Sequence, residues 1–209
     1  MSGIVEYFTA LPFWELIAVF TALLYVIFAA RVNIWCWPAA LVSTAIYTVI
    51  FYDVYLWMDG LLQVYYFVMA IYGWYLWRNK MPDAQPGDSI IRWQLSTHVY
   101  AIAALSLLSL GLGWFMDNYT PTHFPYVDSA TTVFAVFATY LVARKVLENW
   151  LYWVVIDLVS IYIYIEKSLQ PTAFLFAVYV VIAVYGYLNW RAQYQSAHVG
   201  AADNKLSVE

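Results

Sequence analysis

Hydrophobic residues along the chain fall into seven long blocks that are separated by short polar segments. The blocks lie near residues 13–31, 34–52, 60–77, 97–116, 128–143, 149–166 and 171–190. A helix needs about 17 to 25 predominantly apolar residues to cross the hydrocarbon core of a bilayer. The pattern therefore predicts an all-α integral membrane protein with seven transmembrane helices.

Composition agrees with this interpretation. Of the 209 residues, 65% are hydrophobic and only 11% are charged, which is outside the range of ordinary soluble domains. The segment before the first block lacks the basic start and the small-residue cleavage site of a signal peptide. We therefore expect the first block to be retained as a transmembrane helix.

The positions of the nine basic residues predict the orientation. With the N-terminus outside, the outer segments contain only Lys167. The inner segments contain the other eight: Arg31, Arg78, Lys80, Arg92, Arg144, Lys145, Arg191 and Lys205. Because cytoplasmic loops carry an excess of Lys and Arg, we expect an external N-terminus and a cytoplasmic C-terminus.

The second half of the chain resembles the first half at one constant offset, which carries position 15 onto position 128. Without gaps, this offset pairs Glu15 with Asp128, Ala30-Arg31 with Ala143-Arg144, Trp37 with Trp150, Asp53 with Glu166, Tyr72-Gly73 with Tyr185-Gly186, and Trp77-Arg78 with Trp190-Arg191. Abundant aromatics could match by chance, but rare charges at both ends of the helices would not. The offset predicts a duplicated three-helix unit.

Two such units and one connecting helix give a 3+1+3 plan. We expect an external N-terminus at 1–12, a first repeat at 13–80, a linker helix at 93–117, a second repeat at 128–191 and a cytoplasmic polar tail at 192–209. Equivalent helices are four crossings apart, so the halves run parallel to each other. Parallel repeats are a transporter architecture that holds substrate near the membrane midplane, between the halves.

A single acidic residue, Asp157, lies in the middle of the sixth block. At 100° per residue, Trp150, Trp153 and Tyr164 fall within roughly 60° of the same helical face. Asp157 lies about 12 Å into a core of about 30 Å, at a depth where we expect none of the chain's Lys or Arg residues. An ionisable residue at that depth is costly and usually functional.

Two interpretations of Asp157 stay open. In the first, the residue is protonated and hydrogen-bonded to a neighbouring helix. In the second, its carboxylate pairs with a cationic substrate while Trp150, Trp153 and Tyr164 stack on an aromatic ring of that substrate. The second interpretation makes these four residues candidate substrate-binding residues.

The offset makes this site one-sided. Asp157 corresponds to Thr44 in the first half, and Trp153 corresponds to Ala40. We expect the first half to supply a facing wall, made of Thr44, Tyr47, Gln63 and Tyr66. The amide of Gln63 would bond either to a polar group of the substrate or to a neighbouring helix.

Several function classes are disfavoured. A lone Cys36 excludes an internal disulfide, no Cys/His cluster has the spacing of a metal site, and we expect no cofactor. There is no basic patch for nucleic acid. An intramembrane aspartyl hydrolase needs two carboxylates at one depth, and Asp53, Asp59 and Asp128 lie near the predicted outer surface. We therefore expect a protein that is not an enzyme.

The chain resembles the PnuC family of vitamin transporters over about residues 12 to 192. The likeness rests on Tyr72-Gly-Trp-Tyr-Leu-Trp77, on Arg144-Lys-Val-Leu-Glu-Asn-Trp150-Leu-Tyr-Trp153, and on the pattern W-x-x-W-x-x-x-N/D-x6-Y that Asp157 and Tyr164 complete. The resemblance implies an inner-membrane homotrimer of seven-helix protomers with a fold related to that of the SWEET proteins. It also implies facilitated diffusion of an unphosphorylated vitamin that a cytosolic kinase then traps.

The resemblance assigns substrate binding to Trp150, Trp153, Asp157 and Tyr164. Family members that carry nicotinamide riboside often have Asn at the position of Asp157, and Asn at that of Ala70. Thiamine and nicotinamide riboside are both aromatic cations that suit Asp157, whereas riboflavin is neutral. We expect thiamine ahead of nicotinamide riboside. The alternatives are a nicotinamide riboside transporter, or a proton-coupled transporter with Asp157 as the relay.

Overall fold

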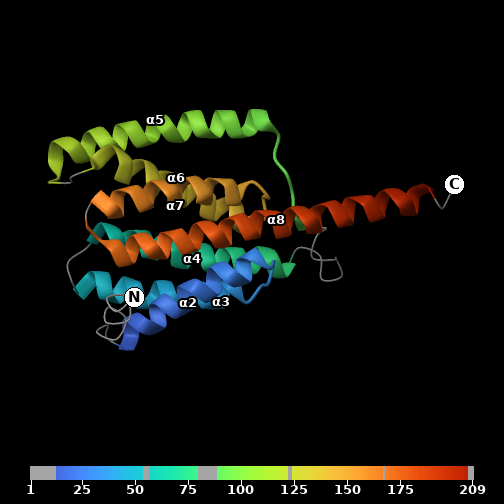
Figure 1. The fold of residues 1–209 in the computed structure, drawn as a ribbon, viewed down its shortest axis with the longest axis horizontal. Helices are drawn as coiled ribbons and strands as arrows, with labels where there is room; N and C mark the ends of the chain where they lie inside the picture. The colour runs from blue at the N-terminus through green and yellow to red at the C-terminus, as the bar shows by residue number, and fades with distance from the viewer. Residues whose placement is uncertain (1–12, 54–56, 80–88, 122–123, 167, 207–209) are drawn as a thin grey trace.

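The structure is a computed structural model that describes residues 13–53, 57–79, 89–121, 124–166 and 168–206. These residues form seven helices: α2 (Phe13–Ala30), α3 (Cys36–Asp53), α4 (Trp57–Asn79), α5 (Leu95–Tyr119), α6 (Pro125–Ala143), α7 (Asn149–Glu166) and α8 (Gln170–Leu206). Successive helices run in opposite directions, and except for α4 and α5 they pack against each other (Figure 1). The seven predicted blocks are confirmed, with most helix ends within a few residues of the prediction.

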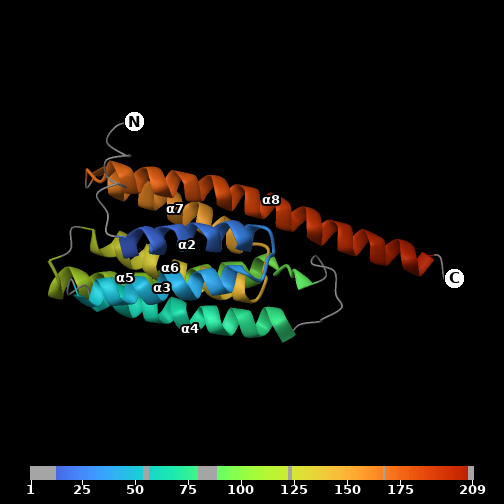
Figure 2. The ribbon, with the colours of Figure 1, turned by 90° about the horizontal axis from the view of Figure 1, so that it is seen from below.

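The largest difference from the prediction is the end of the last helix. The seventh block was predicted to end near residue 190, yet α8 continues to Leu206 and extends past the other helices (Figure 2). Its continuation includes hydrogen bonds from Ser196 Oγ to the Ala192 carbonyl and between His198 Nδ1 and the Tyr194 carbonyl. No proline or glycine interrupts residues 187–198, so the helix persists where the hydrophobic pattern stops. The cytoplasmic location of this segment stays a prediction.

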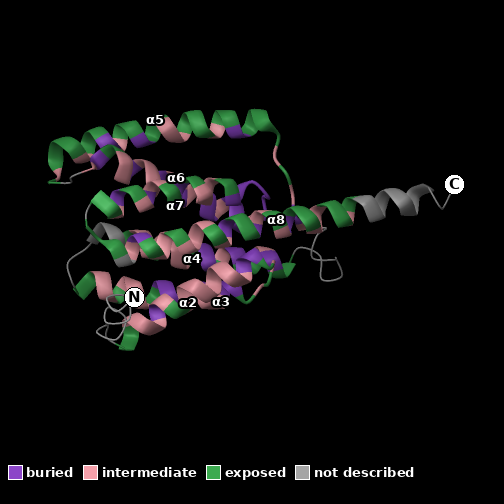
Figure 3. Cartoon of the chain, viewed as in Figure 1, coloured by how far each residue is buried: buried purple, intermediate pink, exposed green. Residues whose placement is uncertain are grey.

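Apolar residues cover the outer surface of the bundle. Leu107 of α5 and Val181 of α8 are 72% and 69% exposed. Figure 3 shows that α5 is exposed along most of its length, while buried residues concentrate on the inner faces and at the turn between α6 and α7. By length and hydropathy alone, α2, α5, α6 and residues 172–198 of α8 are sufficient to cross a membrane. An outward apolar surface is what a lipid environment requires.

The turns after α2 and α6 have the same geometry. Val32 has a φ of 56° and Lys145 a φ of 55°, and the offset between the halves pairs these two positions. The amide that follows each of them reaches back to a helix carbonyl at 2.9 Å, from Asn33 to Phe28 and from Val146 to Leu141. These equivalences are what a duplicated three-helix unit predicts.

Glycine and tryptophan also pair in the same way in the two halves. A Cβ atom on Gly73 would lie 2.3 Å from the ring of Trp37, and one on Gly186 would lie 2.7 Å from the ring of Trp150. Only glycine lets α4 approach α3, and α8 approach α7, this closely. The same offset again relates both members of each pair.

Four tryptophans join the halves at one end of the bundle. Their rings form the chain Trp37, Trp77, Trp190 and Trp150, with successive centroids 5.4, 6.1 and 5.6 Å apart. The indole of Trp77 donates to the Ala143 carbonyl, and that of Trp190 donates to the Ala29 carbonyl. Each half therefore binds the end of the first helix of the other. We call these four residues the tryptophan cluster.

Candidate functional site

A cavity of about 880 Å³ lies between the two halves. All seven described helices contribute side chains to its wall. The lining includes all eight residues that the sequence singled out: Thr44, Tyr47, Gln63, Tyr66, Trp150, Trp153, Asp157 and Tyr164. The volume is within the range of cavities that enclose small organic molecules. Contact of these residues with a substrate stays a prediction.

Helix α7 presents a continuous face to this cavity. Trp150, Trp153, Asp157 and Tyr164 line it together, as their helical spacing predicted. Ser160 lies on the same face, one turn beyond Asp157. Since α7 begins at Asn149, the carboxylate of Asp157 is near the middle of the helix.

Asp157 is only 4% exposed. Within the residues that the structure describes, its carboxyl group has no hydrogen bond and no ion pair. The interpretation in which Asp157 bonds to a neighbouring helix therefore lacks a partner among those residues. A buried carboxyl group without a protein partner is expensive, and it borders a cavity that is large enough for an organic ligand.

The opposite wall is less polar than its side chains suggest. The hydroxyl group of Thr44 donates to the Ala40 carbonyl at 2.7 Å, so its hydrogen is used within its own helix. The side chain of Gln63 has no hydrogen bond to another described residue. The bond from Gln63 to a neighbouring helix, which was one of its two expected roles, is therefore not formed among the described residues. The Gln63 amide is available to a ligand.

Aromatic rings line the cavity at the end remote from Trp150 and the tryptophan cluster. Tyr164 of α7 stacks on Phe176 of α8 with centroids 5.1 Å apart and an interplanar angle of 27°. Phe176 in turn meets Tyr179 edge to face, at 5.8 Å. One face of the Tyr164 ring is thus packed against protein.

Sequence reasoning missed several lining residues. Ser160 could have been found, because it is three positions after Asp157 on the same helical face. Tyr25 and Tyr179 could not have been singled out, because the chain is 21% aromatic and most aromatic residues face lipid or protein. Asp128, which was expected near the outer surface, also lines the cavity.

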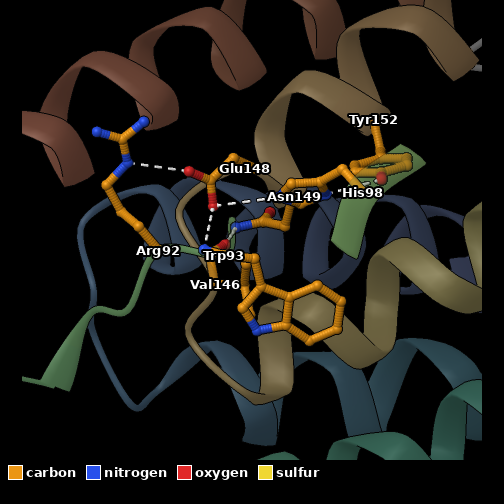
Figure 4. Close-up of polar contacts among 7 residues, drawn as sticks. All are labelled: Arg92, Trp93, His98, Val146, Glu148, Asn149 and Tyr152. Atoms are coloured by element: carbon orange, nitrogen blue, oxygen red, sulfur yellow. Dashed lines mark hydrogen bonds and ion pairs between the residues drawn. The ribbon is translucent and has the colours of Figure 1, made fainter. Parts of the chain in front are cut away.

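A polar network fixes the start of α7 (Figure 4). Glu148 accepts hydrogen bonds from Arg92 Nε at 3.0 Å and from the backbone N–H of Trp93 at 3.3 Å, and it lies 3.7 Å from His98 Nε2. His98 Nδ1 lies 2.9 Å from the Tyr152 hydroxyl group. The hydrogen bond to Glu148 raises the pKa of Arg92 above its ordinary value.

The segment before α5, which carries Arg92 and Trp93, also pairs with the turn before α7. Ile91 exchanges backbone hydrogen bonds with Lys145 and Leu147, at 3.0 and 2.9 Å. The network and this short pairing hold the segment before α5 against the end of α7 that carries Trp150. They orient the first turn of the helix whose next two turns carry Trp153 and Asp157.

Residues 12–192 match the sequence profile of a family described as nicotinamide mononucleotide transporter. The chain belongs to this family. The match covers most of the chain and agrees with the extent of the resemblance to PnuC proteins. The family's description is one of transport, which agrees with the expectation that the protein is not an enzyme. Membership and the apolar helices make it a multi-pass protein of the inner membrane.

Relatives named nicotinamide riboside transporter PnuC match part of the chain. The Escherichia coli (strain K12) protein is 32% identical over 89 residues, which are 43% of this chain and 37% of the relative. The Haemophilus influenzae protein is 32% identical over 65 residues, 31% of this chain and 27% of the relative. Both matches therefore span less than half of the relative's length.

The fold is similar to that of a solved structure titled "Crystal structure of the Vitamin B3 transporter PnuC". The TM-score is 0.75 at 19% sequence identity, over 93% of this chain and 87% of that one. At this identity the likeness concerns the fold. It supports the seven-helix architecture and, with the family match, confirms the resemblance to PnuC proteins.

Proposed function

We propose that the protein transports nicotinamide riboside across the membrane through the cavity between its halves. The observation that carries this proposal is Asp157, a carboxyl group 4% exposed on the cavity wall, without a partner among the described residues. A pyridinium ring would supply the missing positive charge, and Trp150 and Trp153 would contact its faces. The names of the relatives point to the same substrate.

The charges of the cavity favour the riboside over the mononucleotide. Two aspartates, Asp128 and Asp157, belong to its lining, and no Lys or Arg among the described residues does. A phosphate group binds well where Arg, Lys or several backbone N–H groups receive it. The phosphate of nicotinamide mononucleotide would instead meet like charge. We therefore infer an unphosphorylated substrate.

The expected preference for thiamine is not supported. Thiamine also carries an aromatic cation, so Asp157 by itself does not distinguish the two vitamins. The relatives that match this chain are named for nicotinamide riboside. The presence of Asp rather than Asn at position 157 thus supports a cationic substrate in general, and the names of the relatives favour nicotinamide riboside.

We propose further that transport is passive. A proton relay through the membrane needs a series of titratable groups, and Asp157 is the only acidic residue near the middle of the described helices. A cytosolic kinase would then trap the vitamin, and three protomers would form the assembly, as the resemblance implies. Cross-linking of the protein in native membranes tests for the trimer.

Calorimetric titration of the purified protein tests the substrate. We expect nicotinamide riboside to bind more tightly than thiamine, and the mononucleotide to bind at least about tenfold more weakly than the riboside, a difference of about 1.4 kcal/mol. Riboflavin, which lacks the cation, is the control. Tighter binding of thiamine than of nicotinamide riboside would reverse the substrate assignment.

Uptake into liposomes that lack any kinase tests the coupling. We expect the internal concentration of vitamin to rise to the external one and stop there, with no effect of a protonophore. Accumulation above that level, abolished when the proton gradient collapses, would favour Asp157 as a relay instead.

A further inference from the structure

Helix α6 also lines the cavity along one unbroken face. Its lining positions are Ser129, at the edge of this face, and Asp128, Thr131, Thr132, Ala135, Thr139 and Val142. Apart from Ser129, these follow the spacing of a single helical stripe. The stripe extends from Asp128 to Val142, which is about 21 Å along the helix axis. The cavity therefore continues from the tryptophan cluster to the first turn of α6.

The two cavity aspartates stand at different levels. Helices α6 and α7 run antiparallel and are joined by the short turn at 144–148, and Val142 and Trp150 line the cavity next to this turn. Asp157 is about two helical turns beyond Trp150, whereas Asp128 is about four turns before Val142. At 1.5 Å per residue, Asp128 lies about 10 Å further from the tryptophan cluster than Asp157 does.

The surroundings of Asp128 are polar. Thr131 and Thr132 follow it on the same face, and Thr120, directly after α5, lines the same end of the cavity. The described lining of the cavity has no Lys or Arg. The carboxylate of Asp128 therefore creates a negative potential at this end of the cavity, along the path of a ligand.

A structural explanation of Asp128 also exists. An acidic residue in the first turn of a helix interacts favourably with the helix dipole, and α6 has Asp128 there. The equivalent residue of the first half, Glu15, lies in the first turn of α2. Glu15 is absent from the cavity lining, so the two acids share the helix-end position and differ in contact with the cavity.

We propose that Asp128 is a specificity-determining residue that draws aromatic cations into the end of the cavity remote from the tryptophan cluster, before they reach Asp157. This role rests on the proposed transport of a cationic vitamin. It assigns the two carboxylates to successive steps: Asp128 acts on the approach of the cation and Asp157 on its bound state. A neutral substrate of the same shape gains nothing from Asp128.

The test uses the full-length protein in liposomes, with Asp128→Asn and the matched control Glu15→Gln. Initial uptake is measured for nicotinamide riboside and for its neutral dihydro form. We expect Asp128→Asn to lower kcat/KM for the cation roughly three- to tenfold at low ionic strength. Uptake of the neutral form should change less than about twofold, because it has no charge for Asp128 to attract. Uptake by the Glu15 variant should change as little, because Glu15 does not line the cavity. In about 1 M salt, where the Debye length is ~3 Å, the effect on the cation should disappear.

Further variants exclude an effect on folding. Asp128→Glu keeps the charge and should keep uptake of the cation, and Asp128→Ser is a second neutral replacement if the Asn variant does not fold. Equal uptake by the wild type and the neutral variants, equal loss for both substrates, or equal loss in the Glu15 variant would each overturn the role of Asp128. If the wild type transports neither vitamin, the proposed function fails as well, and that result is distinct from the other three.

Discussion

In the first half of the protein Trp37 packs on Gly73, and in the second half Trp150 packs on Gly186 in the same way. The turns that precede these tryptophans also match, down to a φ of 56° at Val32 and 55° at Lys145. At the end of the cavity that Trp37 and Trp150 line, the two halves pack in the same way. Close contacts of this kind tolerate little change, because each partner requires the shape of the other.

The positions that face the middle of the cavity differ between the halves. Asp157 has Thr44 as its equivalent, and Trp153 has Ala40. These four side chains line the cavity. A substitution at one of them therefore does not require a matching change in a residue of the other half. The comparison teaches that the packing is the same in both halves while the proposed recognition of the ligand is one-sided. Four predictions test this contrast.

The largest expected effect is the loss of ligand affinity when the charge of Asp157 is removed. Asp157→Ala removes the carboxyl group, and we expect binding of nicotinamide riboside to weaken by about 2–5 kcal/mol, because a buried cation would lose its partner. The measurement is calorimetric titration. The control is Thr44→Ala at the equivalent position, where the lost hydroxyl group bonds only within its own helix and little change is expected. Equal losses in the two variants would contradict a one-sided site.

The second prediction concerns the duplicated packing. Gly73→Ala and Gly186→Ala should each lower the free energy of unfolding by about 1–3 kcal/mol, because the added Cβ atom would collide with a tryptophan ring. Thermal unfolding in detergent measures the loss. Gly111→Ala in α5 is the control, since nothing lies within 4 Å of its Cβ position. If only one of the two variants were destabilised, the packing of the two halves would not be equivalent.

The third prediction sharpens the contrast on the ligand side. Trp153→Leu should weaken binding of the aromatic cation by about 0.5–2 kcal/mol, because the ring face is lost while an apolar side chain remains. Trp153→Phe, which restores a ring, should recover part of the affinity. Titration with both variants provides the measurement, and an unchanged affinity in the Leu variant would remove Trp153 from the site.

The smallest effect is expected from the network at the start of α7, which has no counterpart in the first half, where Trp35 occupies the position of Glu148. Arg92→Gln should lower the free energy of unfolding by less than about 1 kcal/mol, because the Arg92 side chain is 56% exposed and its ion pair is screened. Glu148→Gln should cost more, since the Glu148 side chain is 11% exposed and also receives the N–H of Trp93. Thermal unfolding of both variants checks the order.

The sequence by itself determined the seven helices, the constant offset between the halves and the helical face that carries Asp157. These follow from local patterns, because hydrophobic length sets a membrane span and 3.6 residues per turn set a helical face. The same reasoning placed the end of α8 too early. A polar helix that extends beyond the bundle leaves no hydrophobic pattern, although its residues permit helix.

Only the tertiary structure decided which of the many aromatic and acidic side chains share one cavity. Tyr25, Asp128 and Tyr179 come from three different helices, and their local sequence does not show that they face the cavity. The rotation of each helix depends on contacts with its neighbours, such as Gly73 on Trp37 and Gly186 on Trp150. The sequence around a tyrosine does not show whether it faces lipid or the cavity, because that direction is set by contacts with residues far away along the chain.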